Sequence, residues 1–169
     1  KVAANTLTLS GANTYTGSTT ISAGTLSISA ASNLSSSAVT LNGGMLLSSN
    51  TISISNAMTV IASGSSVGAT AGNIFTISSN IGGANSAGLI VGGGQSGVVV
   101  LSGTQGFVGG ITVSSGVLNV SANTNLGASG IGDVTISGGG SLYALSGFII
   151  SRNITLGTGG GTIAAASGQ

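Results

Sequence analysis

The sequence repeats itself nearly twice, and this self-similarity limits the possible folds more than any other feature. Leu9-Ser10-Gly11 recurs 92 positions later as Leu101-Ser102-Gly103. The copies then run in step until a short insertion around Gly130-Ile131-Gly132 lengthens their separation to 96 positions. The repeat predicts one solenoid domain, 1–169, with a first unit at about 1–92 and an incomplete second unit at about 93–169.

Within each unit, apolar residues alternate with small polar ones, which is the period of a β-strand. The clearest alternations in the first unit are Leu7-x-Leu9, Leu26-x-Ile28, Val39-x-Leu41, Ile52-x-Ile54 and Met58-x-Val60. Their counterparts in the second unit are Val99-x-Leu101, Ile111-x-Val113, Val134-x-Ile136 and Ile154-x-Leu156. Val, Ile and Thr dominate these segments, while Gly and Ser interrupt the chain too often for helices.

Short strands are compatible with two all-β architectures. The hairpins of a β-sandwich usually turn at Asn-Gly or Asp-Gly, and Asn42-Gly43 is the sole such pair in the sequence. Small residues, glycines and inward aliphatic side chains suit turns that stack on one another. We therefore predict a right-handed parallel β-helix, a β-solenoid, in preference to a sandwich.

The side chains that carry most enzymatic chemistry are almost absent. The 169 residues include two basic residues, one acidic residue, no His and no Cys. Acid–base catalysis needs a titratable group in reach of a partner, and a serine nucleophile needs a base. We predict that the protein is not an enzyme and has no catalytic, cofactor-binding or metal-binding residues. Arg152 and Tyr143 are expected to lie on the surface or to make a local hydrogen bond.

A few residues deserve a second interpretation. Asp133 could ligate calcium, but a single carboxylate in a pattern that does not recur favours a turn residue. The glycine runs 92–94 and 138–140 lack the Lys-Ser/Thr pair of a phosphate-binding loop, so they are predicted to be tight corners. Tyr15 and Phe107 occupy equivalent positions and are predicted to pack, with carbohydrate stacking as the alternative.

Charge and hydropathy also limit the partners. Nucleic-acid binding needs clustered Lys and Arg, which the sequence lacks. No apolar run approaches the ~18 residues of a membrane-spanning helix. We expect no nucleic acid and no membrane insertion by this segment.

The segment from Leu7 to Leu26, LTLSGANTYTGSTTISAGTL, resembles the autotransporter-associated β-strand repeat. A weaker copy runs from Leu101 to Leu118, with Phe107 in place of Tyr15. The resemblance implies a bacterial parallel β-helix passenger that is exported across the outer membrane and is displayed or released at the surface. Such passengers are commonly adhesins or stalks, and the near absence of charge here favours a polymeric role.

Three functions remain open at this point. The leading one is an extracellular structural segment, a stalk or adhesin-like part whose partners are neighbouring repeats of a longer chain, or host or matrix surfaces. The alternative is a filament subunit that associates with itself, end to end or laterally. Ice binding is weaker, because the threonine pairs at 6 and 8 and at 14 and 16 are replaced in the second copy by Val98, Val100, Gly106 and Val108.

Overall fold

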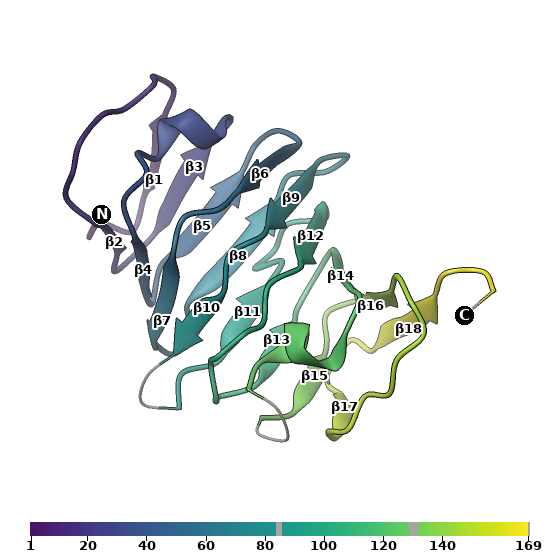
Figure 1. The fold of residues 1–169 in the computed structure, drawn as a ribbon. Coiled ribbons are helices and arrows are strands. Elements are labelled where there is room, and N and C mark those ends of the chain that lie inside the picture. The colour runs from purple at the N-terminus through teal and green to yellow at the C-terminus, as the bar shows by residue number, and fades with distance from the viewer. Residues whose placement is uncertain (84–85, 129–131, 169) are drawn as a thin grey trace.

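The computed structural model describes residues 1–83, 86–128 and 132–168, which wind into a parallel β-solenoid of about seven turns (Figure 1). The described residues form eighteen short strands in three sheets that run along the solenoid. The two ends of the chain lie at opposite ends of the solenoid (Figure 1). The inserted Gly130 and Ile131 lie outside the described residues.

The strands are short because each crosses only one face of a turn. The eight-stranded sheet contains, in spatial order, β1 (Thr6–Leu9), β3 (Thr25–Ile28), β5 (Met45–Ser48), β8 (Ser66–Ala69), β11 (Leu89–Val91), β13 (Ile111–Val113), β15 (Val134–Ile136) and β17 (Ile154–Leu156). The six-stranded sheet contains β6 (Ile52–Ile54), β9 (Ile74–Ile77), β12 (Val98–Leu101), β14 (Val117–Val120), β16 (Gly140–Ala144) and β18 (Gly161–Ala165). The four-stranded sheet contains β2 (Thr19–Ile21), β4 (Val39–Asn42), β7 (Met58–Ala62) and β10 (Ile81–Gly83). Two 3-10 helices, η1 (Ala31–Asn33) and η2 (Asn123–Leu126), lie between strands.

Each turn of the solenoid takes about 20 residues. Paired residues are separated by 19 positions at the least, as Thr6 and Thr25 are, and by 24 at the most, as Ser66 and Ile90 are. Each of these strand pairs is parallel, as are the others among the described residues. The predicted parallel β-helix is therefore confirmed, since the hairpins of a sandwich would pair neighbouring strands antiparallel.

The core is built from columns of aliphatic side chains, one from each turn. We call the longest the aliphatic column, and its members pair strand by strand along the eight-stranded sheet: Leu7, Leu26, Leu46, Val67, Val91, Val113, Ile136 and Leu156. Its inner members are fully buried. Removing each from water contributes about 1.5–3 kcal/mol, so every turn is stabilised by the turns on either side.

The sequence unit does not match a whole number of turns. From β3, four steps along the eight-stranded sheet lead to β13, and one further strand leads to β14 in the six-stranded sheet. Because β14 is the sequence counterpart of β3, one unit covers four turns and a third. In the same way, β2 of the four-stranded sheet corresponds to β13 of the eight-stranded sheet. Equivalent residues of the two copies therefore lie on different faces of the solenoid.

The outward threonines show this rotation. On the four-stranded sheet, three threonines stack in consecutive turns: Thr20, Thr40 and Thr59. Their sequence counterparts stack on the eight-stranded sheet: Thr112, Thr135 and Thr155. The unit thus carries one threonine column, and its second copy places that column one face further round.

The glycine runs form corners, as predicted. Gly92, Gly93 and Gly94 all have positive φ, at 94°, 53° and 88°, a region that favours glycine. A Cβ on Gly92 would lie 2.1 Å from the carbonyl oxygen of Ser115 in the next turn. The corner therefore needs glycine both for its backbone conformation and for the close approach of two turns.

Candidate functional site

The repeated motif makes one full turn, in which its last strand pairs with its first. In the first copy β3 pairs with β1 and places Leu26 beside Leu7. In the second copy β14 pairs with β12 and places Leu118 beside Val99. Between these strands the chain passes through a strandless corner, which we call the motif corner: residues 10–18 in the first copy and 102–110 in the second.

A buried asparagine holds the segment that follows each motif turn. The Asn33 Oδ1 accepts hydrogen bonds from the backbone N–H groups of Ser29, at 2.8 Å, and Ala30, at 2.9 Å. Its Nδ2 donates to the carbonyl oxygen of Gly11 at 3.1 Å, one turn earlier. A carboxamide is suited to this position because it accepts and donates at once.

The second copy repeats this asparagine contact on another face. The Asn125 Oδ1 accepts from the N–H groups of Ser121 and Ala122, both at 2.9 Å, and its Nδ2 donates to Gly103 at 3.0 Å. The sequence alignment matched Asn33 with Asn125 but assigned them no role. Their recurrence 92 positions apart, followed each time by Leu, was the available signal.

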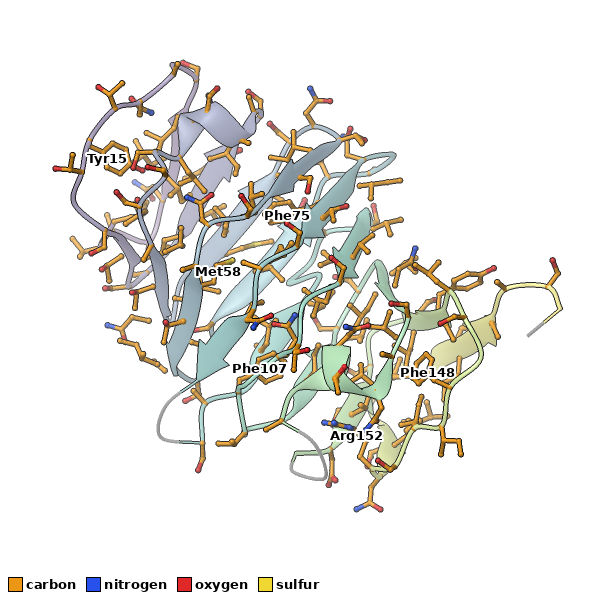
Figure 2. The ribbon with its side chains drawn as sticks, in the orientation of Figure 1. Tyr15, Met58, Phe75, Phe107, Phe148 and Arg152 are labelled. Atoms are coloured by element: carbon orange, nitrogen blue, oxygen red, sulfur yellow. The ribbon has the colours of Figure 1, made fainter. Side chains whose placement is uncertain are left out.

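The aromatic residue of the second motif corner packs in the core, as predicted. Phe107 is fully buried (Figure 2). Gly83 of β10 lies on one side, where an added Cβ would come within 2.4 Å of the Phe107 Cα. Gly127 lies on the other, and a Cβ there would be 2.9 Å from the ring. Two glycines in adjacent turns therefore make room for Phe107.

Tyr15, its counterpart, is not packed in the core. It is 38% exposed, and its hydroxyl lies 2.7 Å from the Thr19 Oγ1. Ser35 stands where the second copy has Gly127, so a side chain replaces the glycine that accommodates the Phe107 ring. The prediction of packing was thus right for Phe107 and wrong for Tyr15.

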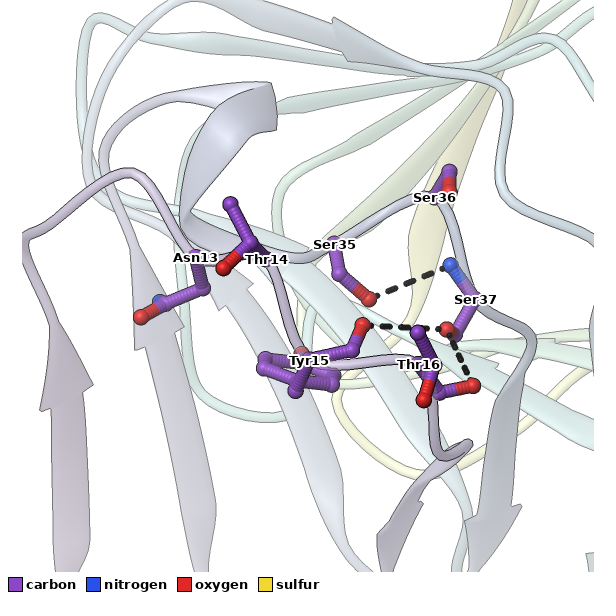
Figure 3. Close-up of a pocket in the computed structure, with 7 residues that line it drawn as sticks. All are labelled: Asn13, Thr14, Tyr15, Thr16, Ser35, Ser36 and Ser37. Carbon is purple, nitrogen blue, oxygen red and sulfur yellow. Dashed lines mark hydrogen bonds between the residues drawn. The ribbon is translucent and has the colours of Figure 1, made fainter.

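A polar pocket lies beside Tyr15 (Figure 3). Its volume is about 420 Å³, and it is lined by Asn13, Thr14, Tyr15, Thr16, Ser35, Ser36 and Ser37. These residues supply hydroxyl and amide groups with one aromatic ring, but no charged side chain. The pocket could accept hydrogen-bonding groups, whereas it lacks the residues for acid–base chemistry.

Arg152 is the most strongly bound charged residue in the described chain. Its guanidinium donates to the Asn123 Oδ1 at 3.3 Å. It also reaches the carbonyl oxygens of Leu126 at 2.8 Å, Gly132 at 3.2 Å, Asn123 at 3.3 Å, and Gly127 and Ala128, both at 3.4 Å. Burial lowers the pKa of Arg152, and the nearby Asp133 carboxylate opposes that shift. Arg152 therefore makes several hydrogen bonds where one local bond was predicted. Together they hold the residues that follow η2, and we call them the Arg152 clamp.

Asn56 is the counterpart of Arg152 in the first copy and also donates to backbone carbonyl oxygens. It lies 96 positions before Arg152. Its Nδ2 donates to the carbonyl oxygens of Ser35, at 2.6 Å, and Ser37, at 2.9 Å. In the second copy the longer side chain of Arg152 reaches carbonyl oxygens before and after the insertion, those of Leu126 and Gly132.

Asp133 is exposed, and its carboxylate accepts a hydrogen bond from the Asn153 Nδ2 at 3.2 Å. Asn153 belongs to the following turn. Among the described residues no group of three His, Cys, Asp or Glu side chains comes together as a metal site would require. Within the same residues, no helix is long and apolar enough to cross a membrane.

Comparison with known proteins agrees with the motif turns. The model of a family described as passenger-associated-transport-repeat matches residues 4–28 and 95–120. Each match covers one motif turn, from the strand that opens it to the strand that closes on it. No curated protein and no solved structure matches the chain. The two repeats and the solenoid together support a parallel β-helix of the autotransporter passenger type.

Proposed function

We propose that the chain is a non-catalytic structural segment of a surface-exposed passenger, a stalk that sets the distance between the cell and whatever the passenger carries. The observation that supports this most directly is the aliphatic column, which runs from one end of the solenoid to the other. Such a stack of turns resists bending, and its length is set by the number of turns. The scarcity of titratable side chains supports a role without catalysis.

Deleting a single turn tests the stalk. Removing residues 25–44 would place Met45 where Thr25 stood, because these residues are partners in adjacent turns. We expect a folded rod that is shorter by one strand spacing, about 4.8 Å, by small-angle scattering. A matched deletion of 25–34, about half a turn, should unfold the N-terminal part, since it moves later strands to the wrong face. Equal tolerance of both deletions would contradict the stalk.

Surface display needs its own experiment. We expect the chain, fused to an outer-membrane translocator, to be labelled by antibody on intact bacteria. Retention of the folded chain in the periplasm would contradict this part of the proposal. Adhesion is measured on the same cells with matrix-coated surfaces.

A second candidate is a filament subunit, which is favoured by the near absence of charge. The 169 residues include two basic residues and one acidic residue. Strands with so few charged side chains lack the residues that usually oppose association of β-sheet proteins. Electron microscopy separates the candidates, since a stalk alone gives short rods of one length and a filament subunit gives rods of many lengths.

A further inference from the structure

The sequence contains one asparagine–glycine pair, Asn42-Gly43, at the corner that joins β4 to β5. Asparagine is chemically labile, most of all before glycine, which has no side chain to hinder the reaction. The Gly43 nitrogen loses its proton and attacks the Asn42 Cγ, the side-chain nitrogen leaves as ammonia, and a cyclic imide forms. Water then opens the imide at either carbonyl carbon, which leaves aspartate or isoaspartate at position 42.

The corner itself requires glycine after Asn42. Gly43 has a φ of 96°, in the left-handed region that favours glycine. Asn42 is the last residue of β4 and is half-buried, and its Nδ2 donates to the Ser22 Oγ at 3.4 Å. A bulkier residue in place of Gly43 would strain this turn. Protection of the pair therefore has to come from its surroundings.

A buried serine binds the nitrogen that would attack. The Gly43 N–H donates to the Ser65 Oγ at 3.0 Å, and the Ser65 hydroxyl donates in turn to the carbonyl oxygen of Ala62 at 2.7 Å. Ser65 is fully buried. The bond holds the Gly43 nitrogen in place and shields its proton from the base that the reaction needs.

Ser65 occupies a position that is aliphatic in the later turns. Ser66 pairs with Ile90, so Ser65 stands in its own turn where Leu89 stands in the next. The turns after that have aliphatic core residues at this position: Ile111, Val134 and Ile154. A hydroxyl in such surroundings is costly unless it is hydrogen-bonded. Its two bonds at the Asn42-Gly43 corner explain why a serine is tolerated there.

The second copy has neither the asparagine nor the serine. Ser137-Gly138 follows β15 in place of Asn42-Gly43, and Gly161 stands 96 positions after Ser65. The glycine N–H of this second pair donates directly to the carbonyl oxygen of Thr158 at 2.9 Å, the counterpart of the carbonyl that Ser65 bonds. The serine hydroxyl is thus inserted between the same two backbone groups only in the copy that has the reactive asparagine.

We propose that Asn42-Gly43 is a latent modification site, which Ser65 keeps closed to deamidation in the folded solenoid. Opening of this corner frees the Gly43 N–H, and the pair then reacts with water as the co-reactant. The product adds a negative charge at the end of β4, and isoaspartate also adds a methylene group to the backbone of the corner. Deamidation therefore marks chains whose solenoid has opened here and hinders its closing. This inference goes beyond the stalk and the filament and depends on neither.

Isoelectric focusing measures the reaction, because each event adds one negative charge to a chain whose formal net charge is +1. Fragmentation in a mass spectrometer then locates the modified residue. At mildly alkaline pH, we expect Asn42 to react about a hundredfold more slowly in the folded chain than in the same chain unfolded by denaturant. Ser65→Ala should raise the rate in the folded chain by about tenfold, because it removes the hydrogen bond to Gly43.

Ser63→Ala is the matched control, since Ser63 is an exposed serine in the turn that contains Ser65. We expect it to react at the rate of the unmodified chain. Val134→Ala truncates the core in a distant turn and lowers stability without touching the corner. At denaturant concentrations that give both variants the same free energy of unfolding, Val134→Ala should react more slowly than Ser65→Ala. Hydrogen exchange in the unmodified chain needs no variant, and the Gly43 amide should be protected.

The proposal is overturned if the folded, unmodified chain reacts at Asn42 as fast as the unfolded chain, or if Ser65→Ala reacts no faster than Ser63→Ala. It is also overturned if Val134→Ala reacts as fast as Ser65→Ala at equal stability, since global unfolding would then control the reaction. A Gly43 amide that exchanges as fast as in the unfolded chain overturns it as well, and this result holds even where Ser65→Ala does not fold.

Discussion

The two motif turns have related sequences and different environments. Asn33 and Asn125 make the same three hydrogen bonds, whereas Tyr15 is exposed and Phe107 is buried. Each asparagine bonds backbone groups of its own segment and one carbonyl oxygen of the motif corner one turn earlier. Both copies contain these two parts. The burial of the aromatic residue depends on the turn before it, which for Phe107 contributes strand β10. Local contacts are thus inherited with the motif, while burial depends on what is stacked in front of it.

The strongest test of this contrast is truncation of the two aromatic side chains. We expect Phe107→Ala to lower the free energy of unfolding by about 3–5 kcal/mol, because it leaves a large cavity in a close-packed core. Tyr15→Ala should cost about 1 kcal/mol or less, since Tyr15 is already 38% exposed and lies outside the core. Denaturant unfolding measures both changes. Similar losses in the two variants would show that Tyr15 is packed in solution.

Truncation of the two asparagines should give the opposite result, a pair of similar effects. Asn33→Ala and Asn125→Ala each leave two backbone N–H groups and one carbonyl without their partner. We expect each to cost about 2–3 kcal/mol, with the same denaturant measurement. A serine at either position restores only part of the loss, because a hydroxyl cannot reach all three groups. If only one variant were destabilised, the shared role would be wrong.

The Arg152 clamp predicts a smaller, local effect. Apart from Lys1, Arg152 is the sole basic residue, so a protease that cuts after Lys or Arg has one internal site. Arg152→Lys keeps that site but loses the planar fork that reaches several carbonyl oxygens. We expect cleavage to be about tenfold faster, as a loss of about 1.4 kcal/mol in the local opening free energy would give.

Mass spectrometry of the released C-terminal fragment measures this rate. Arg152→Gln is the control, because it loses the clamp and the cleavage site together and should stay uncut beyond Lys1. Equal rates for the unmodified chain and Arg152→Lys would contradict the clamp.

The smallest expected effect is that of pH. Burial lowers the pKa of Arg152 below its ordinary, strongly alkaline value, so the unfolded state binds the proton more tightly and stability rises with pH only in that alkaline range. With a single acidic side chain in the sequence, we expect the free energy of unfolding to vary by about 1 kcal/mol or less from pH 4 to pH 9. Thermal melting across this range checks it, and a steep acid transition would contradict it.

The sequence predicts the fold because its information is local and repeated. Alternation in segments such as Val39-x-Leu41 and Val134-x-Ile136 indicates strands, and both are strands. The turn length was not visible, because the strongest similarity spans several turns. Residues 148–150 align with the strand β6 yet form no strand. They lie on the face of the four-stranded sheet, which ends at β10. No strand of the preceding turn is therefore available on this face for pairing.

The details of the site were harder to predict, for physical reasons. The exposure of Tyr15 goes with the side chain of Ser35, which stands where the second copy has Gly127, and the motif does not encode this difference. The partners of Arg152 are mostly backbone carbonyl oxygens, which leave no trace in side-chain identity. Asn33 and Asn125 were predictable in principle, because an asparagine that recurs at the same place in both copies, followed each time by Leu, indicates a buried, fully bonded group.

The extra third of a turn in each unit has a consequence for a longer fibre. The threonine column moves from the four-stranded to the eight-stranded sheet between copies, and a third copy would carry it to the remaining face. Three units would return it to its starting direction. In a passenger built from such units, a surface feature of the unit would recur along a spiral and would face every direction around the solenoid axis. It would need no particular rotation about its own axis to meet a neighbour or a target.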